Sequence, residues 1–157
     1  ASFIAMETGF SKMDINTMVL GGHGDTMVPM LRYCTIAGIP VKEFIPKDRL
    51  DAIVERTRNG GAEILALKQN SSAYDAPAAS VTEMVDAIVH NRNRILPTVC
   101  LLDGEYGHKD IAIGVPAMLG QNGVADIIQL DMNQAEQAMF DQSAALVRKD
   151  LDLLKSM

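Results

Sequence analysis

The sequence contains no tryptophan, only two cysteines, and fewer basic than acidic side chains. With 14 Lys and Arg against 20 Asp and Glu, the formal charge is −6, and there is no basic stripe that would neutralise phosphates. Cys34 and Cys100 cannot build a disulfide framework, and each lies in an apolar run, so we expect buried, reduced thiols. No apolar run approaches the roughly 18 residues needed to cross a bilayer. We therefore expect a cytoplasmic protein that binds neither nucleic acid nor membrane.

Several common catalytic motifs are also missing. The sequence has no G-x-G-x-x-G, no G-x-x-x-x-G-K-[ST], no H-E-x-x-H, no C-x-x-C and no G-x-S-x-G. A nucleotide site of the usual kind, a zinc protease and an α/β-hydrolase are each disfavoured. The 157 residues are 48% hydrophobic, which is enough for one globular domain with a substantial core.

The apolar spacing predicts an α+β fold. A helix within the first ten residues ends at Gly9, and the later helices and strands follow from periodicities near 3.6 and 2 residues. Helices are predicted over 47–58, 62–68, 77–89 and 133–155, and strands over 15–20, 30–36, 95–102, 111–116 and 124–129. The Gly-Gln-Asn-Gly run at 120–123 is typical of a tight turn, so we expect antiparallel sheets packed with helices.

Three finer expectations concern the helices. The Gly60-Gly61 pair predicts a kink or a break, because each glycine weakens a continuous helix by about 1 kcal/mol relative to alanine. Asn133, with Glu136 three residues on, has the spacing of a capping box. Apolar side chains give two helices a predicted buried face: Val81, Met84, Val85, Ile88 and Val89 in one, and Ala138, Met139, Ala145, Leu146, Leu151 and Leu154 in the other.

One segment carries a chemical signal. His23 follows a short β-like run and has Gly22 and Gly24 on either side, which leaves its backbone open to close approach by a ligand. Imidazole can take up a proton and return it near neutral pH, so this position suits a general acid and base. A histidine in a turn is, however, often only a surface group, and the spacing alone leaves the two interpretations about even.

The surrounding sequence resembles malate dehydrogenases of the lactate-dehydrogenase-like group. Gly22 favours the malate enzymes, because the lactate enzymes commonly have Gly-Glu-His-Gly-Asp at this segment. The resemblance covers essentially the whole chain and is carried by these segments: Leu20-Gly21-Gly22-His23-Gly24-Asp25, Met27-Val28-Pro29, 37–41, 54–58, 60–64, 76–80, Gly114-Val115-Pro116 and 119–124.

The resemblance implies a function and a division of labour. His23 would accept the proton of the 2-hydroxyl of (S)-malate while a hydride passes to NAD, and would return it when oxaloacetate is reduced. The aspartate that orients this histidine and the arginines that clamp the substrate carboxylates would precede Ala1, together with the Rossmann NAD-binding domain. Residues 1–157 would then be the C-terminal catalytic, substrate-binding and oligomerisation domain, and the isolated chain is expected to be inactive.

Further residues are placed near substrate or cofactor by the resemblance. Besides Gly22 and Gly24, these are Ala73, Pro77 and Ser80, which would open the helix that faces the nicotinamide. Small side chains there would leave room for the second carboxylate of oxaloacetate. The alternative is that this stretch is a helix start and nothing more.

Other functions remain open from the sequence. The chain could be a non-catalytic oligomerisation module, a domain of a related 2-hydroxy acid (lactate) dehydrogenase, or a metal hydrolase with His23, Asp25 and His108 as ligands. No metal site is expected, because nothing in the spacing of these residues requires one. The family forms dimers and tetramers, so a homo-oligomer is expected. Asp25 is expected to structure its turn, His90 to end a helix, and Arg56 and Arg58 to be solvated or at a subunit contact.

Overall fold

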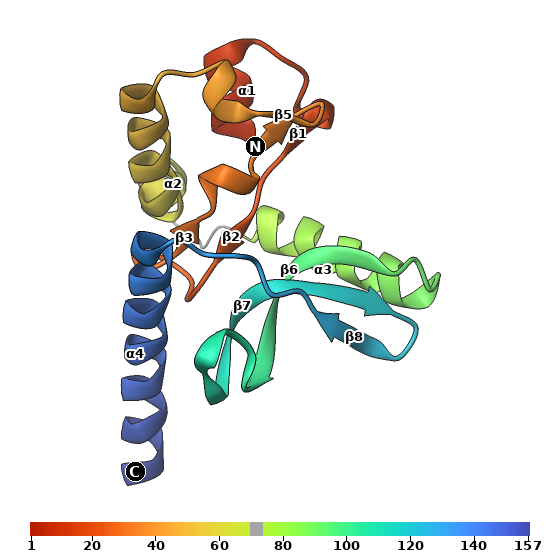
Figure 1. The fold of residues 1–157 in the computed structure, drawn as a ribbon, viewed down its shortest axis with the longest axis vertical. Helices are drawn as coiled ribbons and strands as arrows, with labels where there is room; N and C mark the ends of the chain where they lie inside the picture. Colours follow the sequence, from red (N-terminus) through yellow and green to blue (C-terminus); the bar gives the residue numbers. More distant parts are fainter. Residues whose placement is uncertain (70–73) are drawn as a thin grey trace.

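The computed structural model describes residues 1–69 and 74–157, where α-helices alternate with short antiparallel sheets (Figure 1). The helices are α1 (Ser2–Thr8), α2 (Lys47–Lys68), α3 (Asp75–Val89) and α4 (Gln134–Ser156). The strands are β1 (Ile15–Asn16), β2 (Val19–Leu20), β3 (Val28–Pro29), β4 (Thr35–Ile36), β5 (Ile39–Pro40), β6 (Arg94–Asp103), β7 (Lys109–Gly120) and β8 (Gly123–Ile127). Single 3-10 turns span Lys12–Asp14, Leu31–Tyr33, Val41–Glu43 and Glu105–Gly107. The α+β prediction with antiparallel sheets is confirmed.

The longest strands form a sheet in the order β6-β7-β8, with both pairs antiparallel. The predicted turn is present, since Gly120 pairs with Gly123 across the β7–β8 hairpin. Two smaller sheets, β1-β4-β5 and β2-β3, are built from two-residue strands. The β2-β3 pair is joined to the large sheet by an isolated bridge between Gly21 and Gly114.

Two clusters of buried side chains form the core. One lies between the inner face of β6 and β7, the β2-β3 pair and α4, with Phe140 at 0% exposure among its members. The other lies among α1, β1, β4 and the start of α2. Each cluster contains one free cysteine, Cys100 in the first and Cys34 in the second, as predicted, and burial raises the pKa of both thiols.

Of the kink or break predicted at Gly60-Gly61, the break is wrong, because α2 runs without interruption through both glycines. An ion pair spans the weak point: Arg56 binds Glu63 through two hydrogen bonds, of 3.0 and 2.6 Å, two helical turns apart. The Arg56 guanidinium also lies over the ring of Phe3 in α1, 4.3 Å from its centroid. The side-chain contacts of Arg56 thus lie at the point where the low helix propensity of the two glycines weakens α2.

The predicted buried face of α3 is only partly present, because Met84 and Ile88 are half-buried but the three valines are exposed. Val81, Val85 and Val89 are 56, 51 and 70% exposed, and the fully buried residue of the helix is Ala87. The three valines follow one another at intervals of four residues, so they form one apolar stripe on the surface. The periodicity thus predicted an apolar side of the helix, but no described residue covers its three valines.

The segments 15–20 and 30–36 are not continuous strands. The first divides into β1 and β2, and the second contains the 3-10 turn Leu31–Tyr33 before β4. Ala37 and Gly38 form the two-residue loop of the β4–β5 hairpin, with the positive φ values, 50° and 83°, that such a loop requires.

The capping box at the start of α4 is confirmed, with both of its hydrogen bonds present. The face of α4 that enters the core is shifted from the predicted one: Phe140, Ser143 and Ala144 are buried, whereas Leu146 and Leu154 are 43 and 67% exposed. Leu154 lies in the last turns of α4, which project beyond the sheet in Figure 1, whereas Leu151 still packs against the core cluster.

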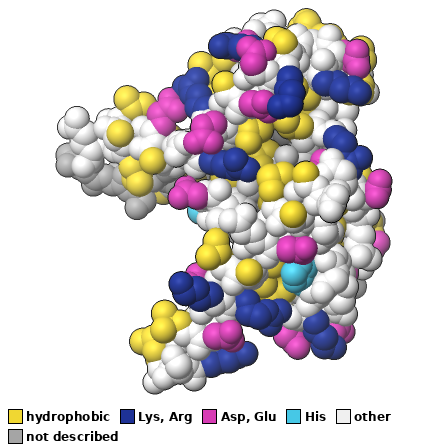
Figure 2. All heavy atoms as spheres, turned by 60° about the vertical axis from the view of Figure 1, so that its left-hand side comes forward, with side chains coloured by type: hydrophobic (Ala, Val, Ile, Leu, Met, Phe, Trp, Pro, Cys, Tyr) yellow, Lys and Arg dark blue, Asp and Glu magenta, His cyan; other side chains and the backbone are white. Residues whose placement is uncertain are grey.

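The surface carries charges of both signs. On the face shown in Figure 2, dark blue and magenta side chains lie next to one another and do not separate into patches of one sign. Ion pairs such as Arg49–Glu7 and Lys47–Asp51 bring opposite charges together on the surface of the protein. Among the described helices, none combines the length and the apolar character that spanning a bilayer requires.

Candidate active site

His23 lies in the connection between β2 and β3, which we call the His23 loop (residues 21–27). Leu20 pairs with Val28, so the loop leaves and re-enters the same two-stranded sheet. Gly24 has a φ of 99°, in the region that favours glycine, and its carbonyl accepts a hydrogen bond from Met27 N at 3.1 Å. The turn therefore closes behind His23 and leaves its side chain exposed.

Gly21 and Gly114 bring the base of the loop against the large sheet. Gly21 N donates to Gly114 O at 2.8 Å, and Gly114 N donates to Gly21 O at 3.1 Å. A Cβ atom on Gly114 would lie 2.6 Å from Gly21 O, which no real side chain tolerates. Glycine is therefore required at Gly114 for close approach, and at Gly21 also for a φ of 90°.

Ser143 of α4 contacts the other side of the loop. Gly22 N donates to Ser143 Oγ at 2.7 Å, and Ser143 Oγ donates to Thr26 Oγ1 at 3.3 Å. Ser143 is completely buried. The predicted site residues Gly22, His23 and Gly24 are therefore held between β7 on one side and α4 on the other.

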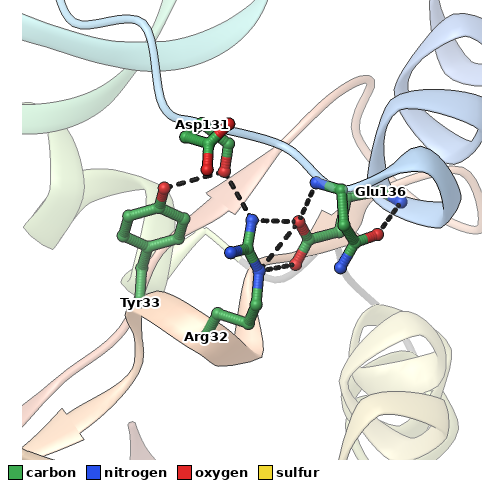
Figure 3. A network of polar contacts seen from close by, with 5 residues as sticks. Arg32, Tyr33, Asp131 and Glu136 are labelled. Carbon is green, nitrogen blue, oxygen red and sulfur yellow. Dashed lines mark hydrogen bonds and ion pairs between the residues drawn. The ribbon is translucent and has the colours of Figure 1, made fainter.

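The start of α4 is itself fixed by the network in Figure 3. Arg32 binds the Glu136 carboxylate through two nitrogens, with its Nη2 2.7 Å from Oε2, and also donates to the carbonyl of Asp131. Tyr33 Oη donates to the same carbonyl at 2.8 Å. The hydrogen bonds from Arg32 hold the pKa of Glu136 below its ordinary value, against the opposing effect of burial. This network anchors the helix that carries Ser143.

A cavity of about 300 Å3 opens beside the loop. Its lining includes Asp25 from the loop, Arg58 from α2 and Gln142 from α4. Arg58 Nε is buried and has no hydrogen-bond partner in the described part of the chain, and its Nη2 lies 3.8 Å from Met139 Sδ. Arg58, expected to be solvated or at a subunit contact, is half-buried beside this cavity.

The remaining predicted residues lie apart from the loop. Pro77 and Ser80 are exposed in the first turns of α3, as expected for a helix start, and Ser80 Oγ donates to Ala76 O at 3.0 Å. Neither lines the cavity beside the loop. Ala73 lies outside the described residues. His90 caps the end of α3, where it contacts Asp86.

The metal-ligand alternative finds no support in the geometry. His108 Nε2 lies 2.9 Å from Asp141 Oδ1, and its ring packs edge-on against Phe140. Across residues 1–69 and 74–157 there is no group of three or more His, Cys, Asp or Glu side chains placed to bind a metal. His23, Asp25 and His108 therefore do not converge.

The sequence and the fold both identify a known class. The chain matches the lactate/malate dehydrogenase α/β C-terminal domain over residues 1–157, and it belongs to this family. It is 63% identical, over 155 residues, to the malate dehydrogenase of Thioalkalivibrio sulfidiphilus, covering 99% of this chain and 50% of that protein. The chain thus spans about half the length of the curated relatives it matches.

Solved structures give the same result. The malate dehydrogenase of Salinibacter ruber superimposes with a TM-score of 0.96 at 46% identity, over 99% of this chain and 50% of that one. The lactate dehydrogenase of Eimeria maxima, solved with NADH and oxamate, has a TM-score of 0.92 at 34% identity, over 99% of this chain and 51% of that one. The expected domain fold is confirmed.

Proposed function

We propose that this chain is the substrate-binding half of an NAD-dependent malate dehydrogenase, with His23 as its proton acceptor and donor. The observation that carries the proposal is the His23 loop: an exposed imidazole between two glycines, fixed at its base by β7 and α4, in a chain 63% identical to a malate dehydrogenase. An exposed imidazole on a fixed backbone is what a general base needs in order to meet a substrate hydroxyl.

In the proposed reaction the proton of the malate 2-hydroxyl moves to His23 as the C2–H bond breaks and the alcohol becomes the ketone of oxaloacetate. NAD supplies the acceptor for the hydride that leaves C2. In the reverse direction the protonated imidazole returns its proton to the carbonyl oxygen. Asp25, exposed in the same loop, makes no hydrogen bond to His23 among the described residues, and the aspartate that orients the imidazole is proposed to lie in the half of the relatives that this chain does not cover.

The nucleotide is proposed to bind to the half of the relatives that this chain does not cover. The sequence has no Gly-rich phosphate loop, which agrees with that division. From this chain, the first turns of α3 with Pro77 and Ser80, and the neighbouring Ala73, are proposed to face the nicotinamide. We expect the chain alone to show no turnover of malate.

The test combines this chain with a separately produced NAD-binding half of a malate dehydrogenase and follows NADH formation. Activity should appear only in the mixture, and His23→Asn should lower it about 10²–10⁴-fold, the usual contribution of a general base. The matched control is His90→Asn, because His90 is also exposed but ends α3. Full activity of His23→Asn, or turnover by the chain alone, would refute the proposal.

A second role is favoured by the exposed stripe of α3. Val81, Val85 and Val89 are each more than half exposed, and such a stripe is normally covered in an assembly. We propose that the complete protein is a homo-oligomer, a dimer or tetramer. Light scattering on the assembled enzyme tests this, and a monomeric mass would exclude it. A chain that assembles but is inactive would favour the oligomerisation module.

A further inference from the structure

We propose that Ser143 is a positioning residue for His23, because its hydroxyl ties the two ends of the His23 loop to α4. The inference rests on the proposed function of His23 as the base. Ser143 lies 121 residues from Gly22 in the sequence, and neither it nor its role is suggested by any catalytic motif.

The hydrogen-bonding capacity of the hydroxyl matches this role. Ser143 Oγ accepts from Gly22 N at 2.7 Å, immediately before His23, and donates its only proton to Thr26 Oγ1, three residues after His23. One side-chain atom therefore contacts both flanks of the loop. His23 itself makes no hydrogen bond in the described part of the chain, so its position depends on these flanks.

The packing leaves no substitute for this contact. Ser143 is 0% exposed, and a Cβ atom added to Gly21 would lie 2.8 Å from the Oγ and 3.3 Å from the Cβ of Ser143. A Cβ atom on Gly22 would lie 3.2 Å from Thr26 Oγ1. Gly21, Gly22 and Thr26 thus all pack closely around Ser143 Oγ. Ser143 Oγ is the acceptor of the Gly22 N–H in the described part of the chain, so this N–H loses its protein partner when the hydroxyl is removed.

Proton transfer is sensitive to such a loss. A displacement of about 1 Å of a catalytic group can lower a rate about 10²-fold even when the change lies outside the reacting atoms. The substrate carboxylates are proposed to bind to groups elsewhere, so the apparent affinity should change little. Removing the Ser143 hydroxyl should therefore affect kcat and leave the KM values almost unchanged.

The experiment compares three variants in the mixture of this chain with an NAD-binding half. Ser143→Ala should lower kcat by about tenfold or more while the KM for malate and for NAD stay within about twofold. Thr26→Val should lower kcat less, because the Gly22 N–H keeps its acceptor. Ile45→Val is the matched control, since Ile45 is buried in the other core cluster and its truncation weakens packing away from the loop.

A kcat of Ser143→Ala within about twofold of the Ile45→Val value, measured in an active mixture, would overturn the inference and leave the proposed function intact. Amide hydrogen exchange on the 157-residue chain supplies a readout that does not need activity. The Gly22 amide should exchange at least about tenfold faster in Ser143→Ala than in Ile45→Val. Equal rates would overturn the inference. A faster rate, together with a wild-type mixture that assembles but has no activity, would show that Ser143 holds the loop but would refute the role of His23, and with it the part of Ser143 in proton transfer.

Discussion

Replacing Gly114 by alanine should destabilise the protein, because the new side chain would meet a backbone carbonyl that cannot rotate away. The added Cβ atom would lie 2.6 Å from Gly21 O, so the two backbones must separate by about 0.8 Å to reach an ordinary contact of 3.4 Å. That separation weakens the two backbone hydrogen bonds at 2.8 and 3.1 Å, each contributing about 0.5–1.5 kcal/mol, and overpacking adds about 1–3 kcal/mol. We expect a loss of about 2–4 kcal/mol.

Thermal unfolding measures this loss. At this chain length each kcal/mol shifts Tm by about 2–4 °C, so Gly114→Ala should lower it by roughly 4–16 °C. Gly61→Ala is the matched control, because Gly61 lies in α2 and its new Cβ would meet nothing within 4 Å. Alanine there should raise stability by up to about 1 kcal/mol. The same sign for both variants would refute the reasoning from close approach.

Other predictions follow from the anchoring of α4 and from the thiols. Arg32 holds the pKa of Glu136 below its value in the unfolded chain, so their contact stabilises the fold above that unfolded value, near pH 4.3, and this contribution is lost as the pH falls further. Glu136→Gln should therefore flatten the acidic part of a Tm–pH profile measured by circular dichroism. Asn133→Ala removes the capping box and should cost about 1 kcal/mol in urea unfolding, and an unchanged midpoint would contradict it. Burial raises the pKa of Cys34 and Cys100, so a disulfide reagent should label both thiols only slowly until the chain is unfolded.

Periodicity predicted the long elements well and the short ones poorly. The strands β6 and β7 and the helix α4 have enough residues for their apolar pattern to be recognised, and the Asn133 cap has a specific local chemistry. The segment 30–36 fails because two-residue strands and single 3-10 turns are fixed by tertiary contacts. Local propensity is a weak guide at that length.

The residues of the candidate site also differ in how well the sequence predicted them. His23 and its two glycines are contiguous, so their pattern was visible in the sequence. Ser143 was not, because its contact joins residues 121 positions apart and a serine in a helix has no distinctive signal. The apolar face assigned to α4 also pointed away from it: the expected Leu146 is exposed, whereas Ser143 lies in the buried row with Phe140. Only the three-dimensional register of the helix reveals the contact.

The double attachment of the His23 loop has a consequence for the order of folding. The loop is encoded near the start of the chain, but its two anchors, Gly114 and Ser143, follow much later. Contacts between residues so far apart in the sequence form slowly, because closing the intervening chain costs conformational entropy. During synthesis at about 5–20 residues per second, the loop must wait roughly 6–24 s before Ser143 has even been added. The site is therefore among the last parts to become ordered, and a chain that ends before α4 would never assemble it.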